Sequence, residues 1–218
     1  MPLLGSPNRE RIAIRRERRS DVAAREALLD AAFGPGRFAK TSERLREGRK
    51  PARGLALVAR RGGRLVGTLR LWSVVTGTGH ACLLLGPLAV AEDARCLGIG
   101  AALMRQALLR AQRLGHRAVI LVGDAAYYDR FGFSAAQTGA LRMPGPYQRD
   151  RLLACELVPD ALRGAGGLIA ATGRPPSRLS GLMDRIAGSQ APVGQPAGSG
   201  TFSGLWGLGG MAVWLFLA

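Results

Sequence analysis

The chain has 218 residues, of which 47% are apolar, so it can bury one sizeable core and wholesale disorder is excluded. Its formal net charge is +16, and residues 1–70 hold 18 Lys/Arg against 7 Asp/Glu. This excess suits acidic substrates, nucleic acid or the phosphates of a nucleotide cofactor. The basic stretches lack interleaved aromatic residues for stacking bases, so we expect no dedicated nucleic-acid binding.

The cysteines and the N-terminus indicate a cytoplasmic protein. Cys82, Cys96 and Cys155 make an odd count and form no C-x-x-C pair. We therefore expect reduced thiols, with neither a disulfide framework nor a zinc or other metal site. The first residues contain no apolar segment of the kind that directs secretion.

The first fifty residues predict one strand and two helices. Residues 12–18 alternate weakly and favour a strand. Ser20 or Asp21 can accept hydrogen bonds from the first turn of a following helix, which ends at the Gly-Pro-Gly of residues 34–36. Residues 41–49 begin with similar capping chemistry and indicate a second, short helix.

Three strands are predicted next. Residues 54–60 and 64–75 flank an Arg-Gly-Gly turn, which is a strong hairpin signal, and residues 81–90 form the third strand. Pro87 has no N–H to donate to a neighbouring strand. We therefore expect this third strand to be interrupted at Pro87, where it would open and leave backbone groups available to another molecule.

A long amphipathic helix is predicted at residues 100–114. Gly115 follows it, in the position of a left-handed cap. Its predicted apolar stripe consists of Leu103, Ala107, Ala111 and Leu114.

The remaining elements point to a mixed α/β fold. Residues 118–122 (AVILV) are too apolar for a half-exposed strand and predict a central strand covered on both faces. Asp124 is expected to cap a short helix at residues 125–130, and residues 152–158 form the last predicted strand. Strands, a crossover helix and a buried strand together indicate a mixed sheet flanked by helices.

The chain divides by composition into three parts: a leader (1–8), one domain (9–163) and a linker with an apolar end (164–218). The third part is rich in Gly, Ala and Pro, and residues 204–218 carry no charge. Fifteen residues fall short of a membrane span. Packing on the domain, self-association, contact with a membrane surface and a shifted reading frame stay open, and we favour a poorly ordered extension.

The loop at residues 95–100, Arg-Cys-Leu-Gly-Ile-Gly, carries the chemistry. It connects a strand to a helix, and its glycines let the backbone approach a ligand at the free N–H groups of the helix start. These features predict a cradle for a diphosphate group. The loop lacks the Gly-Lys-Ser/Thr of a P-loop, and Leu103 stands where a dinucleotide fingerprint has its third glycine.

Three segments in this order resemble the GNAT superfamily of N-acetyltransferases: residues 88–103 (LAVAEDARCLGIGAAL), residues 118–122 and residues 127–133 (YYDRFGF). The resemblance covers about residues 10–160. It is strongest to a bacterial branch that carries L-G-P-L-A-V and G-D-x-x-Y-Y-x-R-F-G-F, which match residues 85–90 and 123–133.

This resemblance implies the GNAT-like acyl-CoA N-acyltransferase fold and acetyl transfer from acetyl-CoA to a primary amine of an unidentified acceptor, by direct attack in a ternary complex. Tyr128 would protonate the departing thiolate. Residues of the opened strand would bind the pantetheine arm, and residues of the loop would bind the pyrophosphate. The implied coenzyme-binding residues are Leu88, Ala89, Val90, Arg95, Cys96, Leu97, Gly98, Ile99, Gly100 and Ala101.

Several of these residues also have a structural interpretation. Tyr128, Phe131 and Phe133 are typical of an aromatic core, and Tyr127 favours packing over catalysis. Asp124 could orient an amine, although capping explains it as well. Cys96 needs no nucleophilic role when transfer is direct.

The general base is not evident from the sequence. Many relatives place a glutamate on the opened strand, but residues 81–90 carry no carboxylate. Glu92 and Asp93 follow that strand, on its expected solvent side, and His80 precedes it in a turn. A water chain or His80 could remove the proton.

Two other classes of function stay open: a non-catalytic CoA-binding or interaction module on the same fold, and an RNA-associated basic protein. A homodimer is also open. The resemblance implies an acceptor pocket built by the first helices and by residues 143–147, without identifying the amine.

Overall fold

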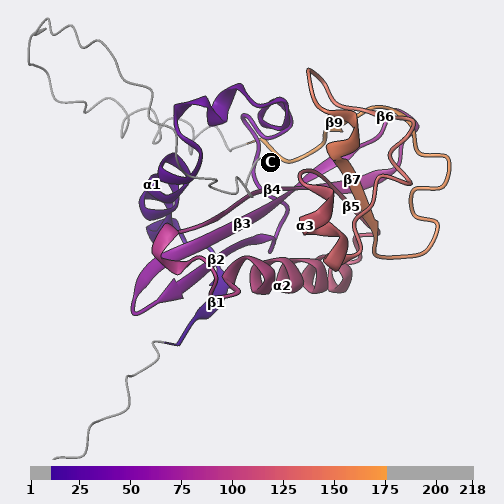
Figure 1. Cartoon of the computed structure of the whole chain (residues 1–218). Helices are drawn as coiled ribbons and strands as arrows, with labels where there is room; N and C mark the ends of the chain where they lie inside the picture. Colours follow the sequence, from indigo (N-terminus) through magenta and orange to yellow (C-terminus); the bar gives the residue numbers. More distant parts are fainter. Residues whose placement is uncertain (1–10, 176–218) are drawn as a thin grey trace, which may run out of the picture.

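The computed structural model describes residues 11–175, so the leader and most of the predicted linker and apolar end lie outside the described residues. Six strands follow one another in the order β1-β2-β3-β4-β5-β7 (Figure 1). All pairings in this row are antiparallel except that of β4 with β5. The strands are β1 (Ala13–Arg16), β2 (Ala56–Arg61), β3 (Arg64–Val75), β4 (Ala81–Val90), β5 (Ala118–Val122) and β7 (Leu152–Glu156).

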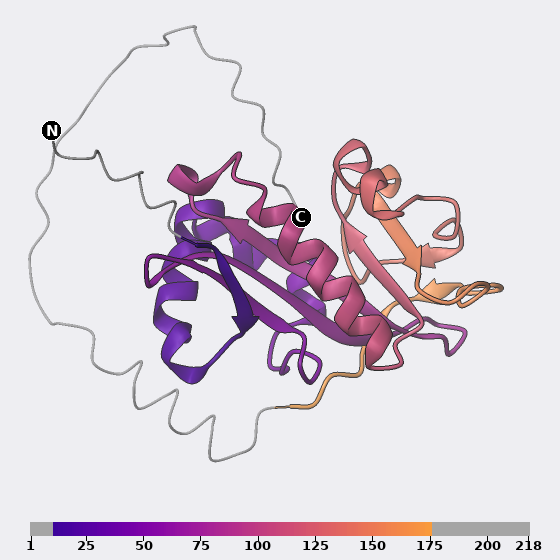
Figure 2. The ribbon, with the colours of Figure 1, turned by 90° about the horizontal axis from the view of Figure 1, so that it is seen from below.

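Two longer helices cover opposite faces of this sheet (Figures 1 and 2). α1 (Val22–Phe33) contacts β3 and β4, while α2 (Ile99–Arg113) contacts β2, β3 and β4. The short α3 (Ala125–Tyr128) follows β5. The 3-10 helices are Arg19–Asp21, Pro35–Ala39, Thr41–Leu45, Glu92–Ala94, Asp129–Phe131 and Arg149–Arg151. The mixed α/β fold that the sequence predicts is confirmed.

The hairpin of β2 and β3 and the third strand follow the sequence pattern closely. Gly62 and Gly63 both have positive φ, as a tight two-residue turn requires, and β4 spans the predicted residues 81–90. β5 lies between β4 and β7, and Val119, Ile120 and Leu121 are fully buried, so its prediction as a central strand is confirmed.

The apolar stripe of α2 is confirmed with one exception. Leu103, Ala107 and Ala111 are fully buried, and Met104 joins them. Leu114 is exposed, contrary to prediction, because the helix ends at Arg113 and Leu114 already belongs to its cap. Gly115 has the left-handed backbone that the cap requires.

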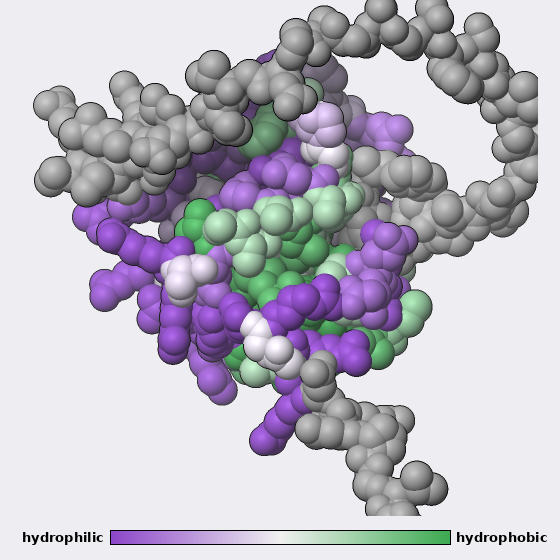
Figure 3. Space-filling view, turned by 90° about the vertical axis from the view of Figure 1, so that its left-hand side faces the viewer, coloured by the Kyte–Doolittle hydropathy of each residue, from purple (hydrophilic) through white to green (hydrophobic). Residues whose placement is uncertain are grey.

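α1 begins where predicted, but its cap differs. Asp21 occupies the cap position without bonding to the first turn; its carboxylate accepts hydrogen bonds from the Arg18 N–H, Arg15 and Arg60. The helix buries Arg25 and exposes most of its alanines. In Figure 3, which faces this side of the molecule, hydrophobic residues accordingly lie exposed among hydrophilic ones.

Two further predictions need correction. The short helix predicted at residues 41–49 is a 3-10 helix and ends earlier, at Leu45. β7 is not the last strand, because β8 (Gly167–Leu168) pairs with β6 (Leu141–Arg142), and β9 (Ala170–Ala171) pairs with β3. Residues 167–171 were predicted to belong to the linker, since strands of only two residues leave no periodic signal. Among residues 11–175, no helix is long and apolar enough to cross a bilayer.

Candidate active site

The strands β4 and β5 separate soon after they meet. They pair only at Leu83–Val119 and Leu84–Ile120. Beyond Leu84, β4 stays paired with β3 on its other side as far as Val90. Within the described residues, the edge of β4 from residue 85 to 90 that faces β5 therefore has no strand partner. A register shift of β4 against β3 coincides with Gly86 and Pro87, which confirms the predicted interruption.

The open edge leads directly into the loop before α2. Cys96 and Gly98 both have left-handed backbone (φ 63° and 72°), which turns the chain sharply into the helix. The first hydrogen bond of α2 runs from the Ala102 N–H to the Gly98 carbonyl (2.9 Å). The N–H groups of Ile99, Gly100 and Ala101 precede it and have no acceptor within the helix.

A cavity of about 500 Å³ lies over these N–H groups. The sequence-predicted residues divide into those that line it and those that do not. Leu88 and Ala89 are buried in the sheet, and the side chain of Leu97 is exposed. The cavity is lined by the predicted Val90, Arg95, Cys96, Gly98, Ile99, Gly100 and Ala101 together with Ala94, Tyr127 and Arg130.

Tyr127 and Arg130 also line the cavity, although the sequence pointed to neither as a coenzyme-binding residue. The Tyr127 hydroxyl lies 3.0 Å from the place that a Cβ on Gly100 would take. The Arg130 guanidinium stacks on the Tyr127 ring (4.6 Å to its centre), and its Nε donates to the Tyr127 carbonyl (2.9 Å). Their spacing of three residues on a short helical segment is the signal that could have paired them. Arg95 forms an ion pair with Glu92 (3.7 Å).

Tyr128 lies behind Tyr127 and is 5% exposed. Its ring packs edge-on against Tyr127 (4.9 Å between ring centres) and against Phe133 (5.9 Å). A Cβ on Gly123 would collide with this ring, so a glycine is needed there. Burial raises the pKa of Tyr128 well above its ordinary value, so the hydroxyl is protonated at neutral pH. Within residues 11–175, this hydroxyl makes no hydrogen bond.

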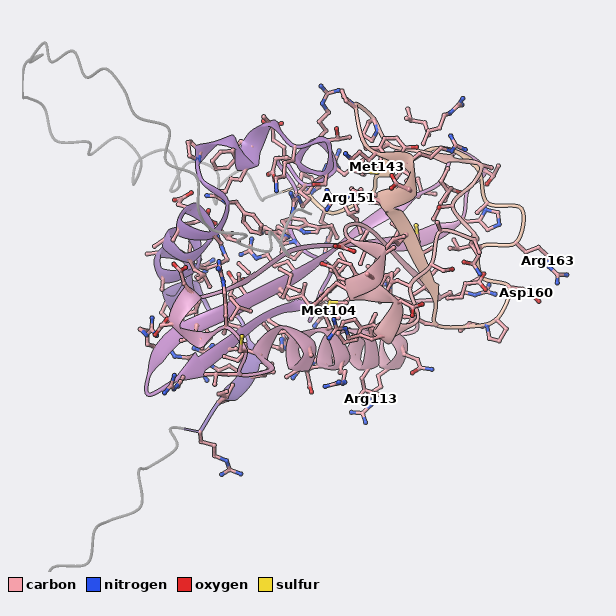
Figure 4. The ribbon with its side chains drawn as sticks, viewed as in Figure 1. Met104, Arg113, Met143, Arg151, Asp160 and Arg163 are labelled. Atoms are coloured by element: carbon pink, nitrogen blue, oxygen red, sulfur yellow. The ribbon has the colours of Figure 1, made fainter. Side chains whose placement is uncertain are left out.

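A second cavity, of about 280 Å³, lies on the other side of the opening between β4 and β5. Val122 lies two residues beyond the last pair on β5, and Gly86 lies two residues beyond it on β4, so the cavity is level with the opening. In the view of Figure 4, Arg151 and Met143 are labelled between the segment that follows α1 and β7. The cavity is lined by Ala39, Lys40, Thr41, Ser42, Val122, Pro146, Tyr147, Gln148 and Arg151.

The candidate bases named from sequence lie elsewhere. His80 is in the turn before β4, where its ring nitrogens lie 3.0 Å from the Thr78 hydroxyl and 3.0 Å from the Arg163 carbonyl. Glu92 is exposed and pairs with Arg95, and Asp93 forms an ion pair with Arg64. Asp124 caps α3 by accepting the Ala126 N–H (2.9 Å), which confirms its structural interpretation.

The largest cavity described, about 860 Å³, lies between the end of β1 and the start of β2. Seven of its fifteen lining residues are basic, including Arg16, Lys50 and Arg53. It includes neither the open edge of β4 nor the start of α2, so we do not assign the coenzyme to it.

The chain is similar to known proteins in both sequence and fold. The sequence profile of the acetyltransferase (GNAT) family matches residues 23–133. The protein of Escherichia coli K12 named "Uncharacterized N-acetyltransferase YhbS" is 32% identical over 150 residues, covering 68% of this chain and 89% of that protein. The chain belongs to the GNAT family. It is accordingly an acetyl-CoA-dependent N-acetyltransferase.

Two solved structures of this family resemble the chain. The crystal structure of YhbS from E. coli in complex with CoA has a TM-score of 0.66 at 32% identity and covers 77% of this chain and 93% of that one. A GNAT-family acetyltransferase from Brucella melitensis in complex with acetyl-CoA has a TM-score of 0.51 at 30% identity and covers 66% and 96%. These relatives bind the coenzyme that the resemblance implied for this GNAT chain.

Proposed function

We propose that this GNAT protein transfers an acetyl group from acetyl-CoA to a primary amine by direct attack in a ternary complex. The observation that carries the proposal is the continuity of the unpaired edge of β4, residues 85–90, with the free N–H groups at the start of α2. One path thus offers hydrogen bonds to an extended chain and then to an anion.

The path suits both parts of the coenzyme. Pantetheine contains two amides in an extended chain, and an open strand edge binds such a chain as it would bind another strand. The diphosphate suits the N–H groups of Ile99, Gly100 and Ala101, where the helix dipole favours negative charge. A cavity of about 500 Å³ at this helix start accommodates it, and Arg95 and Arg130 in its wall add positive charge.

We assign the final proton transfer to Tyr128. The amine nitrogen forms a bond with the thioester carbonyl carbon and releases a proton to water, the carbon–sulfur bond breaks, and the sulfur takes the proton of the Tyr128 hydroxyl, which water then restores. Two observations support this role: the hydroxyl is protonated at neutral pH because the ring is buried, and the positive charge of Arg151 counteracts part of the rise in its pKa.

We propose that water removes the proton from the ammonium group of the acceptor. None of the residues that line the 280 Å³ cavity carries a carboxylate, and His80 is engaged in its turn. A chain of water molecules through this cavity is therefore the simplest acceptor for the proton.

Exchange of Tyr128 for phenylalanine tests the assignment. Tyr128→Phe should lower kcat by about a hundredfold or more, because the leaving thiolate loses its proton donor. Its dissociation constant for CoA should stay within about twofold, since the hydroxyl makes no bond in the described structure. Steady-state kinetics and calorimetry measure the two quantities.

Tyr127→Phe is the matched control, because its hydroxyl lies at the cradle instead of behind it. We expect this variant to change the KM for acetyl-CoA more than kcat. Equal kcat in the Tyr128→Phe variant and the parent protein would refute the acid role. Coenzyme binding without turnover of any amine would indicate a non-catalytic CoA-binding module.

A further inference from the structure

Two arginines lie beside the coenzyme cradle and pair with no carboxylate among the described residues. Arg130 lines the 500 Å³ cavity, and Arg105 follows Ala101, another lining residue, by one turn on the same face of α2. The guanidinium groups of Arg130 and Arg105 lie 5.9 Å and 6.0 Å from the centre of the Phe131 ring. Both cations therefore lie around one aromatic ring, next to the cavity.

The guanidinium of Arg130 is held in place by uncharged groups. It stacks on the Tyr127 ring (4.6 Å to its centre), and its Nε donates to the Tyr127 carbonyl (2.9 Å). These contacts use the flat face of the guanidinium and one of its N–H donors, and they leave its charge in place. Within residues 11–175, its two terminal nitrogens donate to no acceptor. A ligand in the cavity thus meets a positioned cation, which reduces the entropy lost on binding.

The two charges are offset from the start of the helix. The free N–H groups that suit a diphosphate belong to residues 99–101, and Arg105 lies one turn further into α2. The Tyr127 hydroxyl reaches the helix start, 3.0 Å from the place of a Cβ on Gly100, while Arg130 packs on the face of the Tyr127 ring. An anion held by this arginine pair is therefore a second anion, near the diphosphate but separate from it.

We propose that Arg130 and Arg105 bind the 3′-phosphate of the coenzyme, so that this protein selects CoA over dephospho-CoA. This inference rests on the coenzyme site proposed above. In CoA the 3′-phosphate is attached to the ribose that carries the diphosphate, so one sugar separates the two anions. A phosphate monoester has a charge of about −1.5 to −2 at pH 7. Guanidinium groups bind its oxygens through paired hydrogen bonds.

Two simpler roles for Arg130 lead to a different expectation. If its guanidinium only packs on Tyr127, or if it binds the diphosphate, its loss changes the binding of CoA and of dephospho-CoA to the same extent. Contact with the 3′-phosphate changes the binding of CoA alone. A comparison of the two ligands therefore separates these roles.

Calorimetry with CoA and dephospho-CoA, which differ only in the 3′-phosphate, is the test. In the parent protein the dissociation constant for CoA should be about tenfold lower or more. The difference should shrink as salt is added, because exposed charges are screened. Equal affinity for the two ligands would overturn the inference and leave the coenzyme site intact. Failure of the coenzyme site itself would show instead as no binding of either ligand.

Variants locate the preference. Arg130→Gln and Arg105→Gln should each bring the two affinities closer, by weakening CoA and leaving dephospho-CoA within about twofold. Arg130→Lys keeps the charge and should retain part of the preference. Arg113→Gln is the matched control, because Arg113 is an exposed arginine in the last turn of the same helix (Figure 4). It should keep the full preference.

Thermal unfolding checks that each variant is folded. An unchanged preference in both Arg130→Gln and Arg105→Gln would refute the proposal. So would an equal loss of affinity for CoA and dephospho-CoA in Arg130→Gln, since the effect would then lie in packing or at the diphosphate.

Phosphorus NMR of bound CoA gives a direct readout of the contact. A phosphate monoester titrates at about pH 6 in water. Neighbouring guanidinium groups favour its doubly charged form, so the pKa of the 3′-phosphate should fall when CoA binds. We expect this fall in the parent protein and in Arg113→Gln, and a smaller fall in Arg130→Gln. An unchanged 3′-phosphate pKa in CoA bound to the parent protein would contradict the assignment.

Discussion

At the scale of single residues, much of the arginine excess is engaged inside the fold. Glu17 is nearly buried and pairs with both Arg25 and Arg70. Asp21, which is 1% exposed, pairs with Arg15 and Arg60. Each carboxylate thus pairs with two guanidinium groups that come from separate elements. Some of the basic residues in the first third of the chain therefore hold β1 and α1 on the sheet through ion pairs. This role is independent of any ligand.

Asp21 provides a prediction on stability and pH. The hydrogen bond from Arg15 is the main cause that lowers its pKa to about 2, against about 3.9 in an unfolded chain. A lowered pKa in the folded state stabilises the protein above the unfolded value, and this contribution is lost as pH falls from about 4 to 2. Asp21→Asn should therefore cost about 2 kcal/mol at pH 7, with a difference that shrinks towards pH 2.

Urea unfolding of the parent protein and the variant at several pH values measures this difference. Asp160→Asn is the control: its carboxylate pairs with Arg163 (3.0 Å) at the exposed edge that Figure 4 labels, where an ion pair contributes little. If the parent protein and Asp21→Asn differed by the same free energy of unfolding at pH 7 and at pH 2, the stabilisation would not come from the ionised Asp21 carboxylate.

At the scale of elements, α2 carries a left-handed glycine at each end. Gly98 precedes its first turn with φ 72°, and Gly115 follows its last turn with φ 82°. A Cβ at either position would meet no atom within 4 Å, so both substitutions bring similar backbone strain and no collision. The two positions differ in one respect, which is that Gly98 lines the 500 Å³ cavity.

This pair separates strain from ligand binding. Gly98→Ala and Gly115→Ala should each destabilise the protein by about 1 kcal/mol, because an alanine resists the left-handed conformation. Of the two variants, only Gly98→Ala should raise the dissociation constant for CoA, by about tenfold or more, since its methyl group projects into the cradle. Thermal unfolding and calorimetry supply the two measurements. Equal loss of CoA affinity in both variants would place the effect in the helix as a whole.

At the scale of the whole molecule, few strand contacts join the β1–β4 part to the part that begins with β5. β4 and β5 pair at two positions, and α2 lies across the sheet beside the opening (Figure 2). A coenzyme bound along the open edge would add hydrogen bonds at this place. Binding should therefore stabilise the molecule as a unit.

We expect CoA at a hundred times its dissociation constant to raise the free energy of unfolding by about 2.7 kcal/mol. Hydrogen exchange should slow at residues 85–90 and 98–101 and change little in the hairpin of β2 and β3. Protection confined to the basic groove beside β1 would instead place the coenzyme in the 860 Å³ cavity.

The sequence by itself determined most of the longer elements and pointed to the loop before α2 as a candidate cradle, because both depend on neighbours along the chain. Periodicity located α2 and β4, Pro87 marked the interruption, and the glycine spacing of residues 95–100 marked the loop over which the structure has a cavity. Local patterns failed where the outcome was not local: Leu114 is exposed by the end of its helix, and β9 is a strand only because β3 offers it an edge.

Only the tertiary structure decided what surrounds the reaction. It placed Tyr127 and Arg130 at the cradle, and it brought Lys40 and Arg151, which are more than a hundred positions apart, to one cavity. No periodicity records such a meeting, since it depends on how far β4 and β5 diverge and on which segments cover the opening. Electrostatic interactions act through space, so the surroundings of such a charged side chain are set only when the chain has folded.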